Sequence, residues 1–171
     1  QRFGGGFTIR AEKCPNRRGV ERIISALGGP TMTFATFAKL AGEGKLKAAY
    51  VTGGYPGEWV SPELAKAAAK IETLIVHDLF PSALDNAAAV RIPSASWAER
   101  EGSFMNCDGL VQAFERAIPP FEGVKADGQF FHELARESGL FRARKTRQKM
   151  AESMPEFAQP FEPQPLPEHA H

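Results

Sequence analysis

The sequence feature best suited to chemistry is a glycine-rich turn at residues 52–57, TGGYPG. It follows a short apolar segment at 47–51, which we expect to form a buried strand, and it precedes an expected helix that starts at Ser61. Ligands of open parallel sheets bind beyond the carboxyl ends of the strands. Glycines there let a phosphate approach the backbone amides. Because the spacing lacks the three glycines of the dinucleotide fingerprint, the alternative is a tight connection between strand and helix.

A second candidate is the pair His77 and Asp78, which follows a continuous apolar segment at 73–76. Such a segment is typical of a strand covered on both faces. Asp78 would then lie on the same sheet edge as the glycine-rich turn, where a carboxylate can accept two hydrogen bonds from a guanine edge. The alternative is an aspartate that caps a helix or a turn. For His77 the ordinary role is that of a structural histidine with satisfied hydrogen bonds.

Other polar residues carry less information. The carboxylates Glu99, Glu101 and Asp108 have no histidine at ligand spacing, so we expect them to be solvated or salt-bridged. The basic stretch at 142–149 spreads its charges around a helix, which is typical of a solvated face. No base lies near Cys107 in the sequence. We therefore assign no catalytic residue and no metal ligand.

Composition excludes several classes of protein. The chain has 171 residues, with 21 Lys and Arg against 20 Asp and Glu, so its net charge is +1. A nucleic-acid binder usually shows a basic excess. No run of about 18 apolar residues exists that could span a membrane. The two cysteines, Cys14 and Cys107, cannot supply a four-cysteine metal or iron–sulfur site. The default location is the cytoplasm.

The order of elements predicts an α/β fold with extended arms at both ends. Residues 1–30 are punctuated by Gly and Pro so often that only Gly19 to Leu27 could be helical, and they suggest an N-terminal arm or connector. Residues 31–140 alternate expected strands with expected helices, which implies parallel strands joined by right-handed crossovers. The expected strands are 47–51, 73–76 and 89–92, and the expected helices include 34–40, 61–71 and one capped by Asp127. Residues 141–171 suggest a basic helix and a Pro-rich tail.

Four segments together resemble the molybdopterin oxidoreductase family. Segment 45–56 resembles a strand and the turn G-x-N/D-P, and 74–80 resembles the next strand, which usually ends in Gln-Asp. Segment 90–99 is similar to V-x-L-P-x-x-x-x-x-E, and 101–112 is similar to E-G-T-F-x-N-x-E-G-R-x-Q. The four segments are KLKAAYVTGGYP, LIVHDLF, VRIPSASWAE and EGSFMNCDGLVQ. The resemblance implies a Rossmann-like parallel-sheet domain over about residues 30–140.

The resemblance also implies a site. In catalytic members this segment contributes to the binding of a molybdopterin guanine dinucleotide. By that resemblance, Gly53, Gly54, Tyr55, His77 and Asp78 would lie near the pterin nucleotide. The family includes molybdenum enzymes such as formate dehydrogenases. It also includes the large iron–sulfur subunit of NADH-quinone oxidoreductase (respiratory complex I), whose similar domain typically carries no molybdenum.

Several positions depart from the family pattern and remove donors or acceptors that a polar dinucleotide would use. This chain has Tyr55 where the family has Asn or Asp, and His77 where the family has Gln. It also has the run 82–84 in place of a Thr-Glu-Thr-like run, Ala89 in place of Asp, and Leu110 in place of Arg. Each lost contact weakens binding by about 1 kcal/mol or more. We therefore expect a degenerate pocket, no cofactor in this chain, and a likeness to the C-terminal part of the large iron–sulfur subunit of NADH-quinone oxidoreductase.

The interpretation is a structural portion of an NADH-quinone oxidoreductase that supports electron transfer without catalysing a reaction alone. The alternative is the pterin-nucleotide-binding part of a molybdenum or tungsten oxidoreductase such as formate dehydrogenase. Family subunits are several times longer, so we expect this chain to be a fragment or to be completed by other subunits. Those subunits, not nucleic acid, are the expected partners, and any contact with the inner face of the membrane is indirect, through the complex.

Overall fold

The structure is a computed structural model that describes residues 16–158. Within that range the chain forms two compact units that are interleaved along the sequence. One unit comprises residues 32–101 and 115–142, and the other comprises the described parts of 1–31, 102–114 and 143–171. The division into 1–30, 31–140 and 141–171 stays a prediction about domain organisation. The parts of the two expected arms at 1–15 and 159–171 lie outside the described residues.

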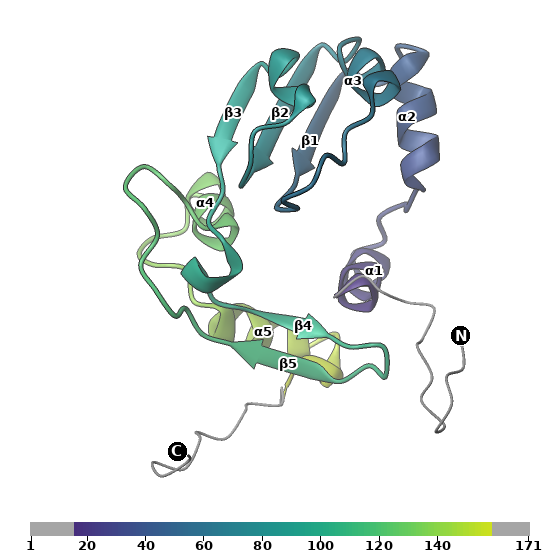
Figure 1. Ribbon diagram of the computed structural model, residues 1–171. Helices are drawn as coiled ribbons and strands as arrows, with labels where there is room; N and C mark the ends of the chain where they lie inside the picture. The colour runs from purple at the N-terminus through teal and green to yellow at the C-terminus, as the bar shows by residue number, and fades with distance from the viewer. Residues whose placement is uncertain (1–15, 159–171) are drawn as a thin grey trace, which may run out of the picture. The chain divides into compact units, whose positions relative to one another are not determined.

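A three-stranded parallel sheet organises the first unit, in the order β1-β2-β3 (Figure 1). The strands are β1 (Ala48–Thr52), β2 (Thr73–Asp78) and β3 (Val90–Pro93). The α/β class with parallel strands is confirmed, and each expected strand lies within two residues of an observed one. Thr52 pairs with His77 and Asp78 with Pro93, so the carboxyl ends of all three strands meet at one edge. The glycine-rich turn therefore opens at the same edge as Asp78.

Helices α2 (Phe34–Gly42) and α3 (Pro62–Ala68) begin where the sequence predicts. The Thr33 hydroxyl accepts a hydrogen bond from the Thr36 amide, and the Ser61 hydroxyl accepts one from the Leu64 amide. Each cap satisfies an amide that the helix itself leaves without a partner. A short 3₁₀ turn, η1 (Ala83–Asn86), carries a capping box closed by Ser82. These local signals fix the starts of α2, α3 and η1.

The apolar core lies against one face of the sheet. Leu74 and Val76 alternate along β2 and are almost fully buried there. The other buried members of this core are Ala41 from α2, Ala68 from α3, Ile71 and Leu84. Burying a large apolar side chain such as that of Leu74 contributes roughly 1.5–3 kcal/mol. The core thus holds α2 and α3 on the sheet and positions its carboxyl edge.

Helix α4 (Asp127–Leu134) supplies aromatic rings to the other face. The rings of Phe130 and Phe131 lie 6.2 and 5.3 Å from that of Tyr50 on β1, measured between centroids. The sequence predicts Asp127 as the cap of this helix, but Ala126 occupies the capping position. The Asp127 carboxylate instead contacts Ser94, past the end of β3, and Arg100, past η2 (Trp97–Glu99). That prediction is wrong because these tertiary partners engage the carboxylate.

The second unit is built around an antiparallel pair. Its elements are α1 (Arg17–Ala26), β4 (Gly102–Met105), β5 (Val111–Phe114), α5 (Ala143–Ala151) and η3 (Pro155–Phe157). Met105 and Val111 from the strands pack with Met154 and Phe157 in a small core. The Asn16 side chain accepts a hydrogen bond from the Met105 amide at 2.9 Å. The helix at 17–26 overlaps the segment 19–27 that the sequence allows to be helical, and the Asn16 contact ties its start to β4. No helix within residues 16–158 is long and apolar enough to cross a membrane.

Candidate functional site

The candidate site is centred on Asp78, the last residue of β2. One carboxylate oxygen, Oδ1, accepts hydrogen bonds from the amides of Leu79 at 2.7 Å and Phe80 at 3.4 Å. The other oxygen, Oδ2, is buried and has no hydrogen-bond partner within residues 16–158. Buried polar atoms without partners are rare because desolvation costs about 1–3 kcal/mol, and more for charged groups. The Oδ2 atom is therefore a buried acceptor at the edge of the sheet whose hydrogen-bonding capacity the described residues do not use.

Gly53 lies directly against this carboxylate. Its amide donates to the His77 carbonyl at 3.1 Å, which extends the pairing of β1 with β2 by one residue. A Cβ at position 53 would overlap both carboxylate oxygens of Asp78. The glycine is thus required by the approach of Asp78, a reason distinct from backbone flexibility. Two of the sequence-predicted residues, Gly53 and Asp78, are brought into contact.

The rest of the turn opens outward. Gly54 has a φ of +134°, which L side chains rarely adopt, and a Cβ there would meet open space. Tyr55 is 67% exposed, and its ring approaches Gly57, where a Cβ would lie 2.9 Å from a ring carbon. The exposed phenol thus stands where the family pattern has a shorter polar side chain.

A cavity of about 460 Å³ lies between this turn and the segment after β2. Its lining residues are Tyr55, Pro56, Gly57, Glu58, Trp59, Val60, Pro62, Phe80, Pro81, Ser82 and Ala83. Of the five predicted site residues, only Tyr55 lines it. Phe80 also contributes a ring that is 42% exposed, and sequence reasoning did not single it out. The signal that could have found it is its position two residues after the strand-ending Asp78.

His77 occupies a different place from the other predicted residues. Its side chain is fully buried and contacts Tyr50, whose hydroxyl lies 2.5 Å from Nδ1, and Phe130, whose ring centroid lies 5.5 Å away. These contacts put the imidazole on the α4 side of the sheet. Because alternate residues of a strand face opposite sides, Asp78 is directed away from it.

The sequence predicts solvated or salt-bridged carboxylates at Glu99 and Glu101, and the prediction is wrong for Glu99. That residue is only 5% exposed, and it closes a capping box at η2. Its carboxylate accepts hydrogen bonds from the amides of Ser96 at 2.7 Å and Phe121 at 3.3 Å. The pKa of the Glu99 carboxyl is lowered, and the largest cause is its hydrogen bonding with Ser96. Glu99 is thus a structural acceptor.

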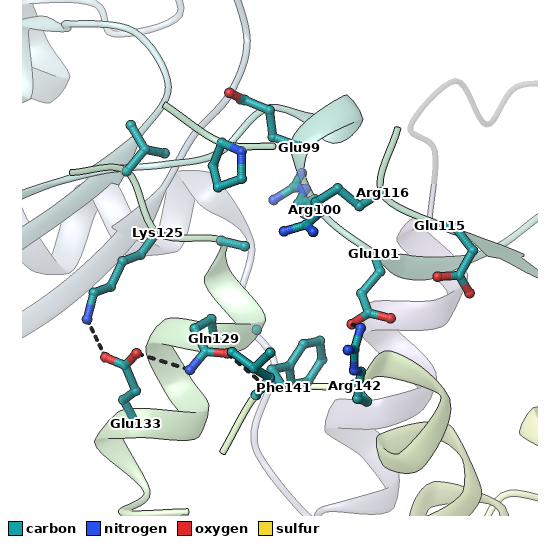
Figure 2. Close-up of a pocket in the computed structure, with 15 residues that line it drawn as sticks. Glu99, Arg100, Glu101, Glu115, Arg116, Lys125, Gln129, Glu133, Phe141 and Arg142 are labelled. Atoms are coloured by element: carbon teal, nitrogen blue, oxygen red, sulfur yellow. Dashed lines mark hydrogen bonds and ion pairs between the residues drawn. The ribbon is translucent and has the colours of Figure 1, made fainter. Parts of the chain in front are cut away.

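A second cavity of about 350 Å³ lies beside α4 (Figure 2). Its charged lining residues are Glu99, Glu101, Glu115, Glu133, Arg100, Arg116, Lys125 and Arg142. Lys125 pairs with Glu133, and Gln129 joins Glu133 to the Phe141 amide, as the dashed lines in Figure 2 mark. With four side chains of each sign, this cavity has no net charge to attract an ionic ligand. Within residues 16–158, no three His, Cys, Asp or Glu side chains are grouped to hold a metal ion.

Comparison with known proteins identifies the class. The family model described as molybdopterin oxidoreductase matches residues 25–137. These residues include the whole parallel sheet and the candidate site. The chain therefore belongs to the molybdopterin oxidoreductase family.

Individual relatives refine the comparison. The chain is 37% identical to formate dehydrogenase H of Escherichia coli over 102 residues, which are 58% of this chain and 14% of that protein. It is 34% identical to the F420-dependent formate dehydrogenase 1 subunit alpha of Methanococcus maripaludis over 129 residues, 69% of this chain and 18% of that protein. An NADH-quinone oxidoreductase subunit of Streptomyces coelicolor is 36% identical over 81 residues, 47% of this chain and 10% of that protein.

The chain thus spans under one fifth of the length of these three relatives. The expected likeness to the NADH-quinone oxidoreductase subunit extends over fewer residues than the likeness to the two formate dehydrogenases. These matches favour a likeness to formate dehydrogenases, which the sequence interpretation held as its alternative.

Proposed function

We propose that this chain is the pterin-nucleotide-binding part of a molybdenum or tungsten oxidoreductase of the formate dehydrogenase type. In this proposal Asp78 binds the guanine end of a molybdopterin guanine dinucleotide at the carboxyl edge of the sheet. The observation that carries the proposal is the buried Oδ2 of Asp78, which has no hydrogen-bond partner among the described residues. The likeness to two formate dehydrogenases supports the choice of branch.

The residues present fit this cofactor. A guanine edge offers two neighbouring N–H donors, and a carboxylate has about four lone-pair positions. Oδ1 of Asp78 uses two of them on the amides of Leu79 and Phe80. Oδ2 accepts no hydrogen bond from the described part of the chain, so its acceptor capacity is unused there, and in this proposal the guanine edge supplies the missing donors. The exposed rings of Tyr55 and Phe80 offer flat apolar surface beside this edge.

The chain's own contribution is binding and orientation. When bound, the metal centre of the cofactor supplies two-electron oxidation and reduction. Asp78 fixes one end of the dinucleotide. Gly53 leaves the space that this carboxylate occupies, since any side chain at position 53 would overlap it. The open surface around Gly54 leaves room for the remainder of the ligand to approach the backbone.

A second candidate function is a structural domain in an NADH-quinone oxidoreductase, without a bound cofactor. The specific observation in its favour is Tyr55, a bulky exposed side chain where the family pattern has Asn or Asp. The match to the NADH-quinone oxidoreductase subunit of Streptomyces coelicolor adds to it. The two candidates differ in whether the purified complex contains molybdenum or tungsten.

The test uses the complex isolated through a tagged copy of the full chain. Elemental analysis is expected to find about one molybdenum or tungsten per complex, and oxidised extracts are expected to show pterin fluorescence. Asp78→Asn should lower the retained pterin and metal about tenfold, because the charged acceptor is lost. Glu72→Gln, at an exposed residue, is the matched control and should retain both. A native complex without metal and pterin would overturn the proposal and favour the structural domain.

A further inference from the structure

The fully buried histidine of β2 has no role in the site described above. His77 is 0% exposed, and Nε2 of its ring has no aligned hydrogen bond within the described part of the chain. That nitrogen nevertheless lies 3.3 Å from Oδ1 of Asp127 on α4. The opposite ring nitrogen, Nδ1, lies 2.5 Å from the hydroxyl of Tyr50 on β1. The imidazole therefore stands between the sheet and the start of α4.

The chemistry of these partners decides where the protons lie. A carboxylate only accepts, so the ring nitrogen that faces Asp127 has to carry a proton. The pKa of the Tyr50 hydroxyl is raised, mainly by burial and secondly by the negative charge of Asp127. The hydroxyl therefore keeps its proton and can donate it in a hydrogen bond to Nδ1 of His77. The arrangement is consistent with a chain of donors that runs from Tyr50 through His77 to Asp127.

Asp127 joins this chain to two further segments. Its Oδ1 accepts a hydrogen bond from the Ser94 hydroxyl at 3.1 Å, and its Oδ2 pairs with the Arg100 guanidinium. One carboxylate thus connects the first turn of α4 to the residues that follow β3 and η2. His77 adds the contact with β2, at the residue that precedes Asp78. The backbone of this pair is fixed as well, since the Gly53 amide donates to the His77 carbonyl and the Ser94 amide to that of Asp78.

We propose that His77 is a positioning residue that, through Tyr50 and Asp127, holds α4 on the sheet and fixes the end of β2 so that Asp78 faces the ligand edge. The two side chains lie on opposite faces of one strand end. Rotation of that end would withdraw His77 from Asp127 and Asp78 from Gly53 together. The ligand part of this inference rests on the proposed nucleotide site, whereas the placement of α4 does not.

The first measurement is the protonation pattern of the ring in the full 171-residue chain. With ¹⁵N-labelled histidine, His77 is expected to show a protonated Nε2 and a hydrogen-bonded Nδ1. Tyr50→Phe removes one hydroxyl and should shift the Nδ1 resonance, with faster hydrogen exchange at the amides of Phe130 and Phe131. His132→Gln, at a partly exposed histidine of α4, is the matched control and should leave the exchange at those amides unchanged. An unchanged Nδ1 resonance and unchanged exchange in Tyr50→Phe would overturn the positioning role.

The second measurement is the binding of GDP, which carries the guanine edge, by titration calorimetry. His77→Asn keeps an acceptor near the Nδ1 position but cannot reach Asp127. It should weaken GDP binding about threefold to tenfold, since coupling through packed networks has this size. If this variant binds GDP as the parent chain does, the link from His77 to Asp78 is overturned. If Asp78→Asn leaves GDP binding unchanged, the proposed nucleotide site fails, and the resonance and exchange data still decide the role of His77 in holding α4.

Discussion

Two residues far apart in the sequence make one contact at the strand edge. Gly53 follows β1 directly and Asp78 ends the neighbouring β2, so the adjacency follows from the expected topology, and the sequence could predict it. The partners of His77 could not be predicted in that way. Asp127 lies on a helix whose packing on the sheet depends on the rings of Phe130 and Phe131. No local signal in the sequence marks Asp127 for a tertiary role, because an aspartate at a helix start ordinarily caps it.

At the residue scale, Gly53→Ala tests the close approach of Asp78. The added methyl group would overlap the carboxylate, so we expect a loss of about 1–3 kcal/mol in the free energy of unfolding, together with weaker GDP binding. Gly42→Ala is the control, since its Cβ would lie an ordinary 3.7 Å from Ala67 at the end of α2. That variant should be neutral or more stable by up to about 1 kcal/mol. Urea denaturation compares the two, and equal stability would contradict the assigned geometry.

Also at the residue scale, Glu99→Gln tests the buried acceptor at η2. Hydrogen bonds in the folded state lower the pKa of Glu99 below its ordinary value of 4.5. The ionised carboxylate therefore contributes stability above that value, and the contribution is lost as the pH falls through the folded-state pKa. Denaturation at several pH values should show the parent chain more stable than Glu99→Gln near neutrality, with the difference shrinking in acid. A difference that does not change with pH would show that ionisation is irrelevant there, whereas Glu72→Gln should match the parent throughout.

At the scale of elements, local signals predict the starts of α2 and α3 well, whereas they predict the second unit, built around β4 and β5, poorly. The caps at Thr33 and Ser61 lie within a few residues of the amides that they satisfy, so the sequence contains the whole interaction. By contrast, α1 is tied to β4 through the side chain of Asn16 and the amide of Met105. Such a contact depends on the folded chain, so a Gly- and Pro-rich segment gives no indication of it.

The cap of α3 provides the prediction at this scale. Ser61→Ala removes the acceptor for the Leu64 amide, and we expect a loss of about 1 kcal/mol in the free energy of unfolding. The same substitution should leave the buried Leu64 in place, since the core contact itself is untouched. Thr31→Ala, at an exposed position outside the helices, is the control and should change stability by less than about 0.5 kcal/mol. Ser61→Asp should restore the loss, and failure to do so would argue against a capping role.

At the scale of the whole molecule, exposed apolar side chains indicate a surface that another protein segment would cover in a larger assembly. In the unit that carries the sheet, Trp97 is 72% exposed, Ile118 51% and Phe121 80%. The segments that carry them are joined, because the Ile118 amide donates to the Ala98 carbonyl and the Phe121 amide donates to the Glu99 carboxylate. Clustered exposed apolar residues mark interaction sites in soluble proteins. We propose that these side chains contact another part of an oxidoreductase complex.

The binding role of the surface around Phe121 can be tested separately from any effect of a substitution on stability. Phe121→Ser should change the free energy of unfolding by less than about 0.5 kcal/mol, because the exposed side chain contributes little to the core. The same variant should bind less of the dye ANS and should be recovered in smaller amounts with the rest of the complex through a tag. Leu134→Ser, at a residue of α4 that is 67% exposed, is the control for the loss of an exposed apolar side chain elsewhere in the same unit. Equal recovery of both variants and the parent chain with the complex would show that the surface around Phe121 is not where the remainder of the oxidoreductase binds.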